Sequence, residues 1–127
     1  YESRLDRLAK SGRAEIKPWS DTYWPSREGG AAYRWQSAGG GKELTDPHYY
    51  RPHDSYALAE MSDESLAKLS PAEKYDIIQG RFDYPTVRKE ASRTSPEMPK
   101  WHGLCHAVAI ATTNFAEPRT VHYRVQL

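Results

Sequence analysis

The sequence predicts a single α+β domain, with helices in the middle of the chain and a strand at its end. Three patterns indicate this class. A helix-start signature begins at Ser70, an apolar and uncharged run begins at residue 104, and residues 119–127 alternate between apolar and polar side chains. The length of 127 residues suits one modest hydrophobic core, so residues 1–127 are expected to form one domain or the N-terminal portion of one catalytic domain.

The first half of the chain carries weak signals for regular structure. Residues 2–10 place leucine and alanine side chains on one face at helical spacing, which predicts a first helix. Residues 15–54 are rich in Gly, Pro, Ser and aromatic residues. We therefore expect an irregular segment with one short strand at residues 31–35 and a glycine turn at residues 39–41.

The middle of the chain carries the strongest helix signals. Ser62 can cap a short helix, and Ser70 precedes a better one with proline at its first position and Glu73 at its third. Gly80 is a plausible end for that helix, and another helix is expected to begin near Pro85.

The last third is predicted to contain a loop, a helix and a strand. A proline-bearing loop over residues 93–103 leads into a helix over residues 104–113, which is apolar nearly all round and is therefore expected to be buried. The alternating residues 119–127 predict a half-buried strand with no turn after it. Because an unpaired edge strand is a liability, we expect further sequence or a second chain to complete the sheet.

Composition excludes several classes of protein. Lys plus Arg number 18 and Asp plus Glu 17, evenly mixed along the chain, which gives no case for nucleic-acid binding. No apolar run is long enough to span a membrane, and a single cysteine excludes an internal disulfide framework. Because the chain begins at Tyr1 rather than Met, we expect a processed piece of a longer protein.

Cys105 is the most informative residue for function. It falls in the first turn of the predicted helix, near the positive end of the helix dipole and unpaired backbone N–H groups. Both favour a thiolate, and the N–H groups can stabilise an oxyanion. Gly103 is expected to let a substrate backbone come close. From its position alone, Cys105 is as well explained by a buried structural thiol, because cysteine is among the most buried residue types.

A resemblance favours the nucleophile. The segments "PWSDTYWPSREGGAAYRW" (residues 18–35), "LSPAEKYDII" (69–78) and "WHGLCHAVA" (101–109) resemble, in order and spacing, the transglutaminase elicitor family, which comprises the oomycete-type transglutaminase and its bacterial relatives. The likeness covers about residues 17–118. The chain departs from the family at "CHAVAIA", where the family has "CHGWAPA", which puts its substrate specificity in question.

The resemblance implies a papain-like, transglutaminase-type cysteine acyltransferase fold. In it, this chain supplies a helical N-terminal portion, the central helix that carries Cys105 and the start of the sheet. The Cys105 thiolate would attack a glutamine side-chain amide of a protein substrate, and a lysine amine of another protein would resolve the thioester. The resemblance implies no cofactor and a secreted or periplasmic location, and the base and its carboxylate partner are expected beyond Leu127, on further sequence or on a second chain from the same precursor.

Three histidines are local candidates for the base or for an orienting role. His122 lies on the polar phase of the predicted strand and is the best geometric candidate. His102 precedes the helix and could swing near the thiol. His106 is adjacent to Cys105, but neighbouring helical residues point about 100° apart, so it more plausibly orients or packs.

Other residues are candidates for lining the expected cleft or for binding a metal ion. Trp101, Gly103, Trp24 and Trp19 are expected to line the cleft, although the two latter tryptophans also suit a core. Four residues have side chains that can bind a metal ion: Asp46, His48, His53 and Asp54. Their spacing matches no standard metal site, and the prolines among them favour a solvated loop, so no metal is predicted.

Two other functions stay open. Water instead of an amine could resolve the thioester, which would make the protein a glutamine deamidase or a cysteine protease. Alternatively, Cys105 could be buried in a catalytically inactive binding module.

Overall fold

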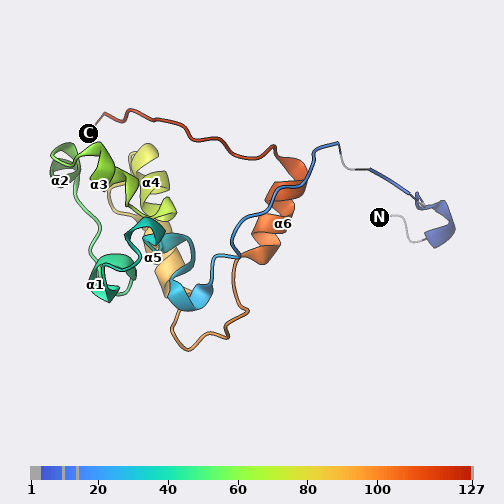
Figure 1. The fold of residues 1–127 in the computed structure, drawn as a ribbon, viewed down its shortest axis with the longest axis horizontal. Coiled ribbons are helices and arrows are strands. Elements are labelled where there is room, and N and C mark those ends of the chain that lie inside the picture. Colours follow the sequence, from blue (N-terminus) through green and yellow to red (C-terminus); the bar gives the residue numbers. More distant parts are fainter. Residues whose placement is uncertain (1–3, 10, 14, 127) are drawn as a thin grey trace.

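The structure is a computed structural model that describes residues 4–9, 11–13 and 15–126, and its regular elements there are helices (Figure 1). The α-helices are α1 (Lys42–Thr45), α2 (Ser55–Ala59), α3 (Asp63–Ala67), α4 (Pro71–Ile78), α5 (Pro85–Ser92) and α6 (Cys105–Asn114). Short 3-10 helices precede them: η1 (Leu5–Arg7), η2 (Ser26–Glu28), η3 (Gly30–Ala32) and η4 (Trp35–Ser37). No helix among the described residues is long and apolar enough to cross a bilayer.

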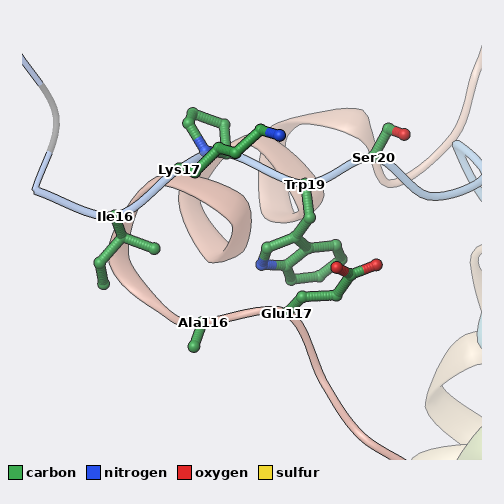
Figure 2. A pocket seen from close by; sticks show the side chains of 7 residues that line it. Ile16, Lys17, Trp19, Ser20, Ala116 and Glu117 are labelled. Carbon is green, nitrogen blue, oxygen red and sulfur yellow. The ribbon is translucent and has the colours of Figure 1, made fainter.

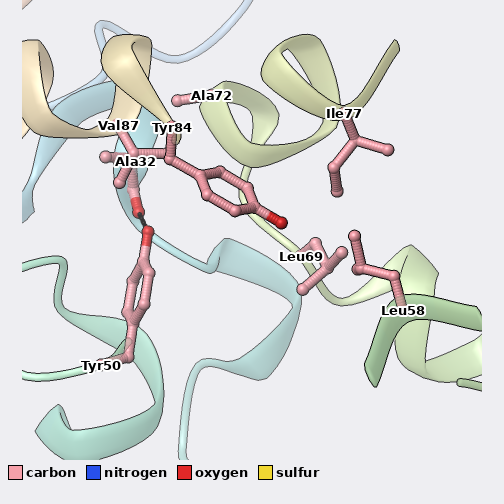
Figure 3. Packing of buried hydrophobic residues seen from close by; sticks show 8 residues of the cluster. All are labelled: Ala32, Tyr50, Leu58, Leu69, Ala72, Ile77, Tyr84 and Val87. Carbon is pink, nitrogen blue, oxygen red and sulfur yellow. Dashed lines mark hydrogen bonds between the residues drawn. The ribbon is translucent and has the colours of Figure 1, made fainter. Parts of the chain in front are cut away.

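The hydrophobic core lies where α4, α5 and η3 meet, and α2 and the loop after α1 close it (Figure 3). Tyr50, in the loop after α1, donates a hydrogen bond of 2.5 Å from its hydroxyl to the carbonyl oxygen of Ala32 in η3. This bond ties the polar end of a buried aromatic ring to the backbone. The buried apolar residues are Ala32, Tyr50, Leu58, Leu69, Ala72, Ile77, Tyr84 and Val87.

Helix α4 begins as the sequence predicts. The Ser70 Oγ accepts a hydrogen bond from the Glu73 N–H at 3.2 Å, and the Ser70 N–H donates to the Glu73 carboxylate at 2.8 Å, which completes a capping box. The apolar side chains of α4 are only partly buried. Ala72 and Ile77 are buried, whereas Tyr75 and Ile78 are exposed.

The helices on either side of α4 also begin where predicted. The Ser62 Oγ accepts from the Ser65 N–H and caps α3. Helix α5 begins at Pro85, and its first turn is capped from a distance, because the Asp76 Oδ2 of α4 accepts from the N–H groups of Thr86 and Val87 at 2.9 and 3.2 Å. This contact joins a side chain of α4 to the backbone of α5.

Helix α6 lies apart from the cluster formed by α1–α5 (Figure 1). Residues 15–23 run along it, and residues 116–126 leave its C-terminal end and return towards α2 (Figure 1). Near the C-terminal end of this segment, Val125 packs against the hydrophobic core.

The burial predicted for α6 is wrong. Thr112 is the one buried residue of this helix, and Ile110 is 63% exposed.

The predicted α+β class is wrong. The described residues contain no strand, and their β-type pairing is an isolated antiparallel bridge between Pro25 and Gly103. Residues 119–126 are extended but unpaired, and Leu127 lies outside the described residues. Side-chain alternation is a local property, whereas a strand also needs a neighbour for its backbone groups. The papain-like arrangement, which requires a sheet beside the cysteine helix, is therefore not formed in the described chain.

Two predictions in the first half are also wrong. The helix expected over residues 2–10 is a single 3-10 turn, η1, in the described residues, while Glu2, Ser3 and Lys10 lie outside them. The strand expected at residues 31–35 is replaced by η3 and η4. The left-handed backbone of Gly29, with φ of 107°, turns the chain just before this segment.

Candidate functional site

Cys105 is the first residue of α6, and it is exposed. Leu104 caps the helix through its backbone carbonyl, which accepts hydrogen bonds from the N–H groups of Ala107 and Val108 at 2.9 and 3.0 Å. Within the described chain, the N–H groups of Cys105 and His106 have no backbone acceptor. The thiol therefore lies beside two N–H groups that can donate to an anion at the positive end of a ten-residue helix.

A short backbone pairing holds the start of α6. The Ser26 N–H donates to the His102 carbonyl at 3.0 Å, and the Leu104 N–H donates to the Tyr23 carbonyl at 2.8 Å. The Tyr23 hydroxyl adds a bond of 2.9 Å to the Lys100 carbonyl. These contacts fix the residues just before Cys105 to a segment some 80 positions earlier in the chain, so Cys105 is held on a defined backbone.

Gly103 does not serve the purpose predicted for it. A Cβ atom at this position would overlap the Tyr23 carbonyl oxygen and lie 3.1 Å from the Trp24 carbonyl oxygen. The close backbone approach that only glycine permits is thus made by the chain itself. A substrate backbone was predicted to lie there, and in this structure the Tyr23–Trp24 backbone lies there.

His102 is the best fixed of the three candidate histidines. It is half-buried, its Nδ1 lies 2.9 Å from the Oγ of the buried Ser26, and its ring lies 5.7 Å from that of Trp101. A hydroxyl bonded to one ring nitrogen orients the imidazole, and it can do so with either tautomer because it both donates and accepts. No hydrogen bond joins Cys105 to an imidazole in the part of the chain that the structure describes. His102 and Cys105 are therefore close in sequence without being hydrogen-bonded to each other.

The other two candidate histidines are less well placed. His106 is exposed and has no fixing contact among the described residues. His122 is also exposed, and it belongs to the segment 116–126, which leaves the end of α6 opposite Cys105 (Figure 1). A helix of ten residues is about 15 Å long, so this segment departs far from the thiol. The prediction that a strand brings His122 to the cysteine is wrong in this structure.

The tryptophans do not form a common cleft. Trp101 is 75% exposed beside His102. Trp24 packs edge-on against Trp35, with ring centroids 6.0 Å apart. Trp19 lies at the other end of α6, where its indole N–H donates to the Phe115 carbonyl at 2.9 Å. Only Trp101 adjoins the start of α6 in sequence.

Two hollows of the described surface lie away from Cys105. One, of about 660 Å³, lies between residues 16–20 and residues 116–117 (Figure 2), and the other, of about 610 Å³, is lined by residue 13 and residues 15–18. Among the residues that line the first hollow, the sequence had singled out only Trp19. It had also not indicated Ser26 as the partner of His102. Nothing in the sequence indicated the other lining residues or Ser26, because each depends on a contact between segments distant along the chain.

Three of the four side chains considered as metal ligands have partners within the chain, namely Asp46, His48 and Asp54. The Asp46 Oδ1 lies 2.8 Å from the His48 Nδ1, and Asp54 caps α2 by accepting from the Ala57 N–H at 2.8 Å. The His53 carbonyl accepts from the Tyr84 hydroxyl. In the residues that are described, no three His, Cys, Asp or Glu side chains come together as a metal site would require.

No protein-family model, curated protein or solved structure matches this chain, so its likeness to the transglutaminase elicitor family is a prediction from the three segments alone.

Proposed function

We propose that the chain supplies the nucleophile of a transglutaminase-type acyl transfer between a protein glutamine and an amine. The observation that supports this best is the exposed Cys105 thiol at the first position of α6, next to two N–H groups without a backbone acceptor among the described residues. A thiol serving only to fill a core would be buried.

The chemistry follows from that position. The Cys105 thiolate attacks the carbonyl carbon of a glutamine side-chain amide, and the oxyanion of the tetrahedral intermediate accepts hydrogen bonds from the N–H groups of Cys105 and His106. The carbon–nitrogen bond then breaks, and ammonia leaves with a proton from the base. A lysine amine then attacks the thioester and gives a proton back to the base; the carbon–sulfur bond breaks, which forms the isopeptide bond and releases the thiolate.

His102 is the histidine we propose as the base. Ser26 holds its Nδ1, so its Nε2 is the nitrogen available for proton transfer. This repeats the general pattern of a nucleophile, a base and a third group that orients the base. The ring must move towards Cys105 when substrate binds, because catalytic hydrogen bonds often form only in the complex with substrate.

A second candidate function, a catalytically inactive binding module, has one observation in its favour. The Tyr23–Trp24 backbone covers Gly103 and occupies the approach that a substrate backbone was expected to use. If this covering persists, Cys105 would face solvent without a neighbouring substrate site.

Amine incorporation distinguishes the two candidates. The full chain is incubated with a glutamine-containing protein and a dansylated alkylamine, and fluorescence in the protein band is measured. We expect incorporation by the wild type, none by Cys105→Ser, and a loss of about 10²-fold or more for His102→Ala. His106→Ala and His122→Ala serve as matched controls and should stay within a few-fold of the wild type.

Each other outcome has a definite meaning. No incorporation by the wild type, while ammonia is still released, would indicate a deamidase, in which water resolves the thioester. Neither incorporation nor ammonia release would favour the binding module. Full activity of His102→Ala would exclude His102 as the base.

A further inference from the structure

The hollow at the C-terminal end of α6 has the walls of a small binding groove (Figure 2). Its volume of about 660 Å³ lies within the range of about 300–1,000 Å³ that is usual for ligand sites. One wall is residues 16–20 and the other is residues 116–117. Ile16, Pro18 and Ala116 contribute apolar surface, and the chemistry of the other lining side chains decides what the groove can bind; they are Lys17, Trp19, Ser20 and Glu117.

Trp19 gives the groove a fixed aromatic surface. Its indole N–H donates to the Phe115 carbonyl at 2.9 Å, which locks the ring between the two walls. Because that donor is already used, the indole can offer a ligand only its π-face. Figure 2 shows the ring extending from residues 16–20 towards residues 116–117. The face of an indole is electron-rich and attracts cations.

Glu117 supplies a negative charge to the same groove. Its side chain lines the hollow from residues 116–117, the wall towards which the Trp19 ring extends (Figure 2). Glu117 forms no ion pair with another described residue. A planar guanidinium can stack on an indole and pair with a carboxylate at the same time, which a compact ammonium cannot do.

We propose that this groove binds an arginine side chain presented by a peptide. The site is separate from Cys105, at the opposite end of α6, and it does not depend on acyl transfer. The guanidinium lies over Trp19 and pairs with Glu117, while Ile16 and Pro18 contact the alkyl part of the side chain. Lys17, on the wall opposite Glu117, repels the incoming cation and keeps binding weak.

Titration of the Trp19 indole N–H signal by NMR tests this proposal on the full chain. The signal is assigned by its loss in Trp19→Phe, and the probe is N-acetyl-arginine amide. We expect a saturable shift, with no such shift for N-acetyl-citrulline amide, which has nearly the same shape without the charge. N-acetyl-lysine amide should bind at least about two-fold more weakly than the arginine probe.

Charge variants give the sharpest outcome, because they should act in opposite directions. Glu117→Gln should weaken binding of the arginine probe by about three- to five-fold, and Lys17→Met should strengthen it by about two-fold. Glu97→Gln, a loop carboxylate outside the groove, should leave binding unchanged.

Three results would overturn the proposal. They are the absence of a saturable shift, an equal response to the citrulline amide or the lysine amide, and weaker binding after Lys17→Met. The last result would mean that Lys17 attracts the ligand, so that the groove binds an anion instead.

Discussion

Glu73 shows how one side chain can hold several parts of the core. It is fully buried, it completes the capping box of α4, and its two carboxylate oxygens accept hydrogen bonds of 2.9 and 2.5 Å from the Arg34 guanidinium. The same guanidinium lies 3.8 Å from the centre of the Tyr50 ring. The capping role could be predicted from the spacing of Ser70 and Glu73. The pairing with Arg34 could not, because 39 residues separate the two partners and no local pattern links them.

Removing one member of this buried pair should cost far more than removing both. Glu73→Ala leaves the Arg34 charge buried without a partner, and we expect a loss of about 3–5 kcal/mol in the free energy of unfolding, measured with urea. The double change Arg34→Met with Glu73→Leu should recover a large part of that loss, because it removes both charges. A loss under about 1 kcal/mol in Glu73→Ala would show that the pair is not buried as described.

Tyr84 makes stability sensitive to alkaline pH. Burial, and then the negative charge of Glu73, raises the pKa of Tyr84 to about 12, above the value near 10 of an unfolded tyrosine. The neutral phenol is thus favoured by folding, so its contribution is fully present below pH 10 and is lost between about pH 10 and 12. Burial shifts the pKa of Tyr50 in the same direction.

We expect Tyr84→Phe to flatten the fall in the free energy of unfolding above pH 10, measured by urea unfolding at several pH values. Below pH 10 the variant should be about 1 kcal/mol less stable, since it loses the hydroxyl bond to the His53 carbonyl. Tyr56→Phe is the matched control, because Tyr56 is exposed and its removal should leave the slope unchanged. If the free energy of unfolding of Tyr84→Phe fell above pH 10 as steeply as that of the wild type, the role given to the burial of Tyr84 would be contradicted.

At the scale of elements, the sequence predicted where helices begin better than what they contact. Ser62 and Ser70 mark helix starts correctly because each caps the residue three positions later, and Pro85 does so because its fixed φ suits the first position of a helix. For α6 the apolar composition indicated burial, but the helix is largely exposed. Its position depends on the pairing of residues 23–26 with residues 102–104, and the sequence carried no sign of that long-range contact.

Gly103→Ala should break this pairing. The added Cβ atom would overlap the Tyr23 carbonyl oxygen, so we expect the start of α6 to separate from residues 23–26 at a cost of about 1–3 kcal/mol. Hydrogen exchange of the Leu104 and Ser26 amides should accelerate by at least about ten-fold. Gly12→Ala is the control, because a Cβ atom there meets nothing within 4 Å. Unchanged protection of both amides in Gly103→Ala would be inconsistent with the described contact.

For the whole molecule, the described chain consists of two parts joined by extended segments: a helical cluster with a small core, and α6 with the chain that runs along it (Figure 1). The sequence predicted a single domain with a sheet, because residues 119–127 alternate as a strand does. Alternation identifies which side chains share a face, but it does not supply a second strand. The candidate nucleophile was found because its position in the first turn of a helix is a local property. The contact between His102 and Ser26 was not found, because it spans 76 residues.

Nucleophilic attack by Cys105 is tested most directly by trapping its acyl intermediate. The full chain is mixed with N-acetyl-glutaminyl-glycine amide without an amine, quenched in acid and weighed intact by mass spectrometry. We expect a mass increase equal to that of the peptide less ammonia, located on Cys105 and removed by hydroxylamine with release of the hydroxamate. Cys105→Ser should show neither the adduct nor ammonia. Ammonia release by Cys105→Ser at the wild-type rate, or the absence of both adduct and ammonia in the wild type, would contradict a nucleophilic role for Cys105.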